Sequence, residues 1–98
     1  MIKKITTNRF EKELTSIVKR GRKVDKLLQI LDLLELNINK GLSYYTLLPP
    51  QYSLHKLSGK YKNRWECHIE PDWLLIFYLD KEVLKLERTG THSDLFKD

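Results

Sequence analysis

Residues 64–79 read RWECHIEPDWLLIFYL and decide the fold. Polar and apolar side chains alternate before the proline, which is typical of a half-buried β-strand over residues 63–70. The alternation gives that strand an apolar face of Trp65, Cys67 and Ile69 and a polar face of Arg64, Glu66, His68 and Glu70. Pro71 and Asp72 predict a tight turn. The next strand, residues 72–80, is apolar on both faces, so we expect it in the centre of a sheet.

Helical periodicity precedes this hairpin. Asn8 with Glu11 resembles a capping box, and Gly21 ends the first predicted helix. A second helix is expected over residues 22–39, and its broad apolar face indicates contacts on two sides. Further strands are expected at residues 2–6, 53–57 and 83–90, with a loop at residues 42–52 and a short turn at residues 92–96. This order predicts an α+β fold in one domain, residues 1–98.

The composition limits the classes of partner. Eighteen Lys and Arg against thirteen Asp and Glu give a net charge of +5, which favours nucleic acid, anionic lipid or an acidic protein. Cys67 is the only cysteine, so we expect no internal disulfide and a reduced, cytoplasmic setting. The longest apolar run, Trp73–Leu79, is too short to cross a bilayer as a helix, so no membrane partner is expected.

Five residues with chemically active side chains gather on the predicted sheet: His55, His68, Asp72, Arg88 and His92. Singly, each is typical of an ordinary surface or turn residue. Together they indicate a shared site, and the residues alone leave both interpretations open. A metal site is disfavoured, because no HxH, HExxH or CxxC pairing is present and neighbouring Lys and Arg would repel a cation. We therefore expect no metal and no cofactor.

The turn also predicts the register of the hairpin. With residues 71–72 at its centre, Glu70 pairs with Trp73 and His68 pairs with Leu75. Trp73 then lies on the same face as His68.

Histidine, aspartate and arginine on a basic surface can cleave RNA without a metal ion. RNA carries its own nucleophile, the 2′-hydroxyl. Histidine accepts or donates a proton near neutral pH, and arginine binds phosphate oxygens through two hydrogen bonds. Trp73 or Phe96 offers an aromatic ring for stacking on an exposed base.

Two segments, HIEPDWLLIFYL (residues 68–79) and LERTGTHSDLF (residues 86–96), closely resemble the YafQ-type branch of the RelE/ParE toxin superfamily. The resemblance covers essentially the whole chain and implies a small twisted, mainly antiparallel sheet with two N-terminal helices packed on one face. It implies the toxin of a bacterial type II toxin–antitoxin system, a ribosome-dependent endoribonuclease that cuts mRNA in the ribosomal A site. The implied partners are mRNA, rRNA and a cognate antitoxin, which neutralises the toxin and joins it in a repressor complex on operator DNA.

The resemblance also implies roles for individual residues. Catalytic positions correspond to His55 in HKLSG, His68 and Asp72 in HIEPDW, and Arg88 and His92 in RTGTH, with substrate contacts at Trp73 and Phe96. We expect His92 to be the general acid, Asp72 or His68 the base, and Arg88 the bidentate phosphate ligand. Lys56, Lys60 and Lys62 are expected to contact phosphates. The chain departs from its relatives at Lys56, where they have proline, and at Asn63, where they have glycine.

Two alternative functions remain. A ParE-like toxin has the same fold and poisons DNA gyrase, but it lacks this set of histidines. A non-catalytic basic nucleic-acid-binding module needs only Lys and Arg, and it gives no reason for Asp72 or His92.

Overall fold

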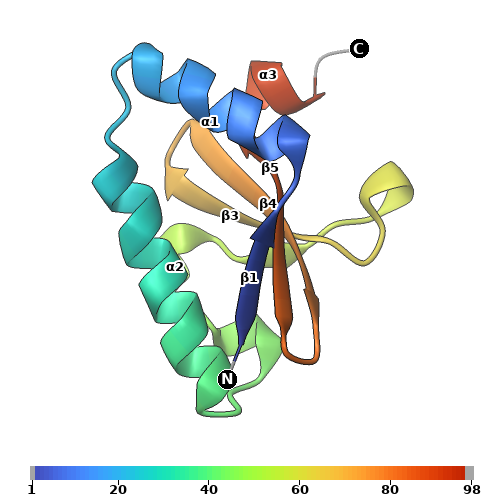
Figure 1. The fold of residues 1–98 in the computed structure, drawn as a ribbon. Helices are drawn as coiled ribbons and strands as arrows, with labels where there is room; N and C mark the ends of the chain where they lie inside the picture. Colours follow the sequence, from blue (N-terminus) through green and yellow to red (C-terminus); the bar gives the residue numbers. More distant parts are fainter. Residues whose placement is uncertain (1, 97–98) are drawn as a thin grey trace.

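The computed structural model describes residues 2–96, which fold around a five-stranded sheet (Figure 1). The strands are β1 (Lys3–Thr6), β2 (His55–Lys56), β3 (Trp65–Glu70), β4 (Trp73–Asp80) and β5 (Val83–Gly90). The helices are α1 (Asn8–Lys19), α2 (Val24–Asn39) and α3 (His92–Phe96), with 3₁₀ turns η1 (Tyr44–Thr46), η2 (Pro50–Tyr52) and η3 (Gly59–Tyr61). The predicted α+β class, with two N-terminal helices packed on the sheet, is confirmed.

The order of strands in the sheet is β1-β5-β4-β3-β2. β1 runs parallel to β5, and the other neighbouring pairs are antiparallel. β4 therefore has a strand on each side, and Leu74, Leu75, Ile76 and Phe77 on it are fully buried. The central place predicted for this apolar run is confirmed.

The ends of the helices differ slightly from the prediction. Thr7, rather than Asn8, caps α1, because its hydroxyl oxygen accepts a hydrogen bond from the Phe10 backbone N–H at 2.9 Å. The same hydroxyl donates to the carbonyl of Glu87 at 2.9 Å, so it also ties the helix start to β5. Gly21 has a φ of +103°, a left-handed conformation that favours glycine, and it follows α1 as expected.

The register of the central hairpin corrects a second prediction. Glu70 pairs with Trp73 as expected, but His68 pairs with Leu74 and not with Leu75, because a bulge at Ile69 shifts the register. The bulge turns Trp73 to the face opposite His68. The physical gain is burial: Ile69 and Trp73 both join the apolar core beneath the helices.

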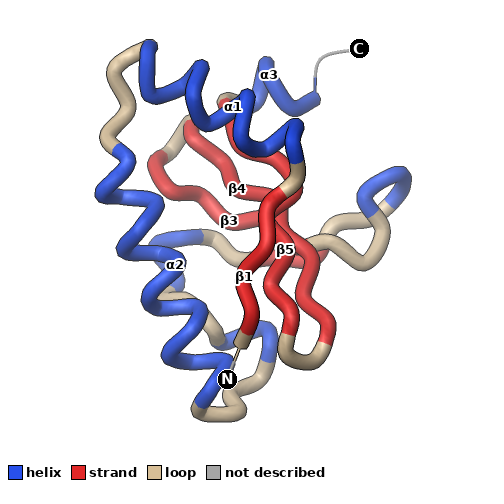
Figure 2. The backbone as a smooth tube through the Cα atoms, in the orientation of Figure 1, coloured by secondary structure: helices blue, strands red, loops and turns tan. Residues whose placement is uncertain are grey.

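The backbone trace shows α1 and α2 beside the sheet (Figure 2). Apolar side chains fill the two sides of this sheet unequally. The main core lies between the sheet, α1, α2 and the connection through η1 and η2. The other face carries a smaller cluster of Leu74, Ile76 and Leu95, so α3 covers only part of it. On α2, Val24, Leu28 and Leu36 remain exposed. The second side of the broad apolar face is thus open in the described part of the chain.

Cys67 lies in the core, where burial raises the pKa of its thiol. The thiol is therefore neutral and chemically inert. None of the helices within residues 2–96 has the length and apolar character needed to cross a bilayer.

Candidate active site

The three histidines lie in a row on the side of the sheet that α3 partly covers. The ring centroids of His55 and His68 are 6.4 Å apart, and those of His68 and His92 are 5.6 Å apart. β2 supplies the first, β3 the second and the start of α3 the third. The structure thus brings together side chains that are up to 37 residues apart in the sequence.

His92 is held by the turn between β3 and β4. Oδ1 of Asp72 accepts hydrogen bonds from the backbone N–H of His92 at 3.0 Å and from its ring Nδ1 at 2.6 Å. The backbone bond, and then the ring bond, lower the pKa of Asp72. A carboxylate of low basicity with an occupied oxygen suits an orienting role better than that of a base. The bond also places the proton of His92 on Nδ1 and leaves Nε2 for chemistry.

At the other end of the row, both ring nitrogens of His55 lie close to protein oxygens. Nδ1 lies 2.7 Å from the carbonyl oxygen of Ser53, which can only accept, so this nitrogen carries a proton. Nε2 lies 3.2 Å from Oε1 of Glu66. Both ring nitrogens of His55 therefore face an oxygen atom of the protein.

Glu66 was missed as a functional residue. It is 4% exposed, and its Oε2 atom is buried without a hydrogen-bond partner in the described residues. Strand alternation had already placed it on the face of His68, and pairing with β2 places it opposite His55. Once β2 had been paired with β3, Glu66 could therefore have been predicted as a carboxylate between two histidines.

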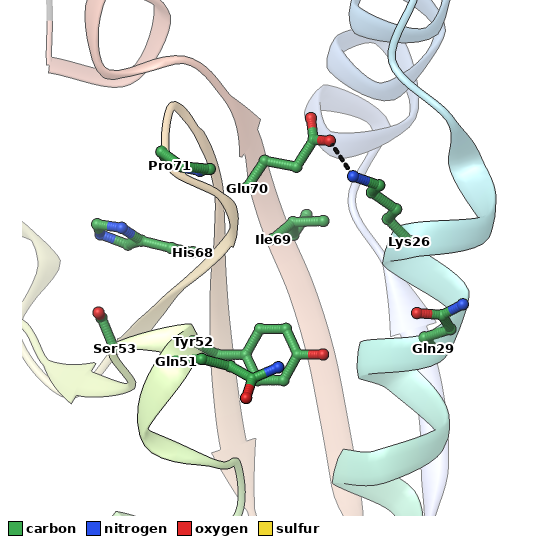
Figure 3. Close-up of a pocket in the computed structure, with 9 residues that line it drawn as sticks. All are labelled: Lys26, Gln29, Gln51, Tyr52, Ser53, His68, Ile69, Glu70 and Pro71. Carbon is green, nitrogen blue, oxygen red and sulfur yellow. Dashed lines mark hydrogen bonds and ion pairs between the residues drawn. The ribbon is translucent and has the colours of Figure 1, made fainter.

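His68 stands between these two histidine–carboxylate pairs. Its Nε2 is 3.8 Å from Oε1 of Glu66, which is longer than a hydrogen bond. No hydrogen bond to its ring is formed within residues 2–96. Figure 3 shows the ring pointing away from α2. Of the three histidines, His68 is the one whose ring forms no hydrogen bond in the described residues, although its Nε2 lies within ion-pair distance of Glu66.

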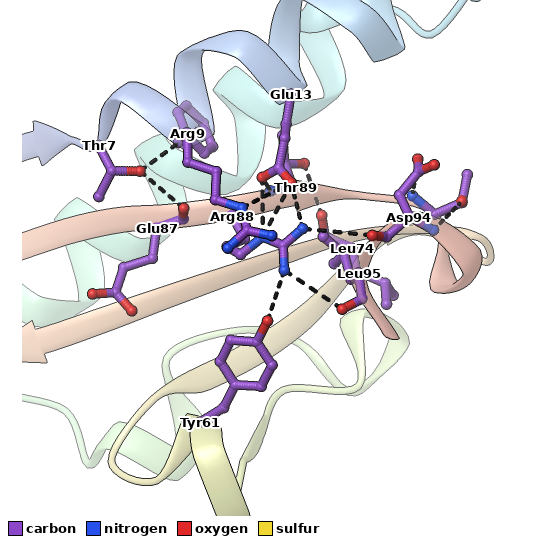
Figure 4. A network of polar contacts seen from close by, with 12 residues as sticks. Thr7, Arg9, Glu13, Tyr61, Leu74, Glu87, Arg88, Thr89, Asp94 and Leu95 are labelled. Carbon is purple, nitrogen blue, oxygen red and sulfur yellow. Dashed lines mark hydrogen bonds and ion pairs between the residues drawn. The ribbon is translucent and has the colours of Figure 1, made fainter. Parts of the chain in front are cut away.

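Arg88 is predicted to bind a phosphate, but in the structure its side chain is buried and already paired. It is 6% exposed, and its guanidinium donates to the carboxylate of Glu13 and to the hydroxyl of Tyr61 at 2.7 Å (Figure 4). Burial acts to lower its pKa, but the bonds to Glu13 and Tyr61 leave the pKa raised. Arg88 joins α1, β5 and η3.

Trp73 also corrects the prediction. It is fully buried, and its indole N–H donates to the hydroxyl of Thr89 at 2.8 Å. No face of its ring is free for a base. Phe96, by contrast, is 44% exposed and meets Tyr61 edge-on, with ring centroids 6.1 Å apart. Of Trp73 and Phe96, only Phe96 therefore has a ring that is open to contact with RNA.

α3 is anchored through Asp94. Its Oδ2 accepts from Arg20 at 2.6 Å and from the backbone N–H of Thr91 at 2.9 Å, and these bonds lower its pKa. A Cβ atom at Gly90 would lie 2.9 Å from Cβ of Asp94, too close for any other residue. The RTGTH segment therefore packs α3 tightly against β5 and fixes the start of α3, where His92 lies.

The other predicted positions are on the surface. Lys56, Lys60 and Lys62 are exposed, and Lys60 lies over the ring of Tyr61 at 5.5 Å. Across residues 2–96, no group of three or more His, Cys, Asp or Glu is arranged to hold a metal ion.

Comparison with known proteins places this geometry in a family. Residues 2–97 match the family of YafQ, a bacterial toxin of type II toxin–antitoxin systems. The chain belongs to the YafQ toxin family. It is 38% identical over 90 residues to the mRNA interferase toxin YafQ of Escherichia coli K12, covering 92% of this chain and 90% of that protein. The resemblance found in HIEPDW and RTGTH is confirmed.

Solved structures of bacterial toxins agree with the fold. A chain in the crystal structure of the E. coli DinJ–YafQ complex superposes with a TM-score of 0.81 at 35% identity, covering 98% of this chain and 99% of that one. A metal-bound toxin from Helicobacter pylori superposes with a TM-score of 0.79 at 33% identity, covering 98% of this chain and all (100%) of that one.

Proposed function

We propose that this protein is an mRNA interferase, a ribosome-dependent endoribonuclease that cuts mRNA in the ribosomal A site. The observation that carries the proposal is the row of three histidines. The ring of its central member, His68, forms no hydrogen bond in the described residues, and His92 keeps Nε2 unbonded. Two proton-transfer groups 5.6 Å apart, measured between ring centroids, suit a reaction that removes one proton and supplies another at the same phosphate.

In the proposed reaction, the 2′-hydroxyl of RNA attacks the adjacent phosphorus. His68 takes the proton of that hydroxyl, and a bond forms between O2′ and phosphorus. Nε2–H of His92 gives its proton to O5′ as the bond from phosphorus to O5′ breaks. The products are a 2′,3′-cyclic phosphate and a 5′-hydroxyl, so atoms and charge balance. Asp72 holds the ring of His92 and stabilises its protonated form.

His55 and Glu66 form a second histidine–carboxylate pair beside His68. Both ring nitrogens of His55 already face protein oxygens, so His55 is less open to a reacting hydroxyl than His68 is. We assign His55 to substrate positioning and reserve the base role for His68. Lys56, next to His55 on β2, is exposed and provides a cation for the phosphate in place of the buried Arg88.

The need for the ribosome follows from the distribution of charge. Arg20, Arg22 and Lys26 on the N-terminal half are already paired with carboxylates, at 2.5–2.6 Å. Lys56, Lys60 and Lys62 form no ion pair within the described residues. We propose that these lysines bind rRNA phosphates and deliver the histidines to the A site.

We also propose a cognate antitoxin as partner. The exposed Val24, Leu28 and Leu36 on α2 offer an apolar surface for it, and the net charge of +5 favours an acidic one. Such a complex would neutralise the toxin in the cytoplasm and bind operator DNA to repress their operon. The DinJ–YafQ complex of E. coli supports a partner of this kind.

Two other functions are weaker. A gyrase poison of the ParE type would not need the hydrogen bonds between Asp72 and His92, and neither would a non-catalytic basic module. Neither needs a row of three histidines whose central ring forms no hydrogen bond.

The test is cleavage of a defined mRNA on purified ribosomes that are programmed with an open A site. We expect one cut in the A-site codon, with a 2′,3′-cyclic phosphate on the upstream fragment, and no cut in the same mRNA without ribosomes. The reaction should proceed after the protein has been stripped of transition metals by a chelator and exchanged back into magnesium buffer. Cleavage that needs a returned transition metal, or a 5′-phosphate on the downstream fragment, would contradict the mechanism.

A further inference from the structure

A polar cavity of about 490 Å³ lies beside His68, at the open edge of β3. β2 is only two residues long, and its pairing with β3 stops at Glu66. Beyond that point the edge of β3 faces α2 across the gap that forms the cavity. Its walls include Lys26, Gln29, Gln51, Tyr52, His68 and Glu70. A volume of this size is typical of sites that bind small organic groups.

The two glutamines of the chain both line this cavity. Gln29 comes from α2 and Gln51 from η2, and Figure 3 shows them on opposite walls. Both residues are exposed, and neither amide forms a hydrogen bond within residues 2–96. An amide offers two donors and an acceptor, which is the combination that pairs with the edge of a nucleobase. The hydroxyl of Tyr52 is equally free on the same wall.

The rim of the cavity is positive. Glu70 accepts from both Arg22 and Lys26, so two cations share one carboxylate. These bonds, the one from Lys26 first, lower the pKa of Glu70 and keep it ionised. The three charges sum to +1, which favours the phosphate that accompanies a nucleotide.

We propose that this cavity binds one unpaired base of the mRNA next to the cleaved phosphate and reads it through Gln29 and Gln51. The inference rests on the proposed function, because His68 lies both in the row of histidines and in the wall of the cavity. An RNA strand whose phosphate reaches His68 carries its neighbouring base to this edge of the sheet. Single-stranded RNA exposes the hydrogen-bonding edges of its bases, so amides can read them.

The experiment measures cleavage rates on ribosomes programmed with mRNAs that carry each of the four bases at each position of the A-site codon. The proteins are the wild type, Gln29→Ala, Gln51→Ala and the double variant. Asn39→Ala, at the far end of α2, removes an exposed amide outside the cavity and serves as the control. Thermal unfolding of each variant shows that it is folded.

We expect the wild type to favour one base at one position. Each glutamine variant should reduce that preference by about 5- to 150-fold, the range for loss of a bidentate amide–base contact. The rate on the least favoured codon should change by less than about twofold, because His68 and His92 are intact.

Unchanged preference at all three positions in the double variant would overturn the inference while leaving the proposed function in place. Weaker antitoxin binding by the glutamine variants, with an unchanged cleavage profile, would also overturn it, since a protein partner would then be the occupant. A wild type that cuts no message on the ribosome would remove the proposed function, and this inference with it.

Discussion

Asp72 and His92 form the contact on which the proposed proton donation depends. Asp72 is an exposed turn residue, so its replacement leaves the core untouched. We expect Asp72→Asn to slow cleavage by about 10²-fold or more, because a neutral amide does not stabilise the protonated ring or fix its orientation. Single-turnover rates on ribosomes measure this, with Asp80→Asn, an exposed aspartate at the far end of β4, as the control. A rate for Asp72→Asn equal to that of the control would exclude the orienting role.

Arg88 belongs to the scaffold, and its replacement should act on stability. Removing one partner of a buried ion pair leaves the other charge unpaired, so we expect Arg88→Met to lower the free energy of unfolding by about 3–5 kcal/mol. The double variant Arg88→Met with Glu13→Leu should recover most of that loss. Denaturant unfolding monitors both. If Arg88→Met keeps the stability of the wild type but does not cleave mRNA, Arg88 would instead be assigned to phosphate binding.

For individual residues, the sequence predicted which side chains lie near one another but not the role of each side chain. Alternation placed His68 on the open face correctly, since it depends only on the two-residue period of a strand. Arg88 could not be assigned, because its partner Glu13 lies 75 residues away on α1. Trp73 was misplaced because a single bulged residue reverses which side of the sheet a strand presents.

Among the elements, α3 and the β3–β4 turn hold the site together. α3 is one short helix of five residues, anchored by the bonds of Asp94 to Arg20 and Thr91. An isolated helix of this length is not stable, so its position depends on those contacts and on the burial of Leu95.

The lowered pKa of Asp94 makes this anchor sensitive to acid. A carboxylate with a lower pKa when folded than when unfolded stabilises the fold above about pH 4, and the contribution is lost as the pH falls through its folded pKa. We expect the stability of the wild type to fall more steeply between about pH 5 and pH 3 than that of Asp94→Asn. Urea unfolding across this range measures the two slopes, and identical slopes would count against the anchor.

The helices and the long strands were predictable because their periodicity extends over many residues. The boundaries of α1 and the length of β2 were not. Thr7 caps α1 because its hydroxyl also bonds to Glu87 on β5, a contact that local sequence does not show. β2 shrinks from the expected residues 53–57 to a two-residue strand, and the space it leaves becomes the cavity beside His68.

Across the whole molecule, charge is distributed so that some cations stabilise the fold and others face outward. Lys56, Lys60 and Lys62 are outward-facing cations near β2 and η3. Replacing all three with glutamine should weaken ribosome binding and flatten its salt dependence, because fewer counterions are released. Sedimentation with ribosomes across a salt series measures the slope.

The control for that experiment replaces Lys3, Lys40 and Lys81, three exposed lysines away from β2 and η3. It removes the same charge from a different surface. Equal slopes for the two triple variants would show that net charge, and not this surface, binds the ribosome.

The central claim is that His92 protonates the departing 5′ oxygen, and a substrate with sulfur in place of that oxygen tests it most directly. A thiolate leaves without needing a proton, so the general acid becomes dispensable. We predict that His92→Gln cuts the natural mRNA about 10²- to 10⁴-fold more slowly than the wild type does, yet cuts the sulfur-substituted mRNA at close to the wild-type rate. An equal defect of His92→Gln on both substrates would contradict this account.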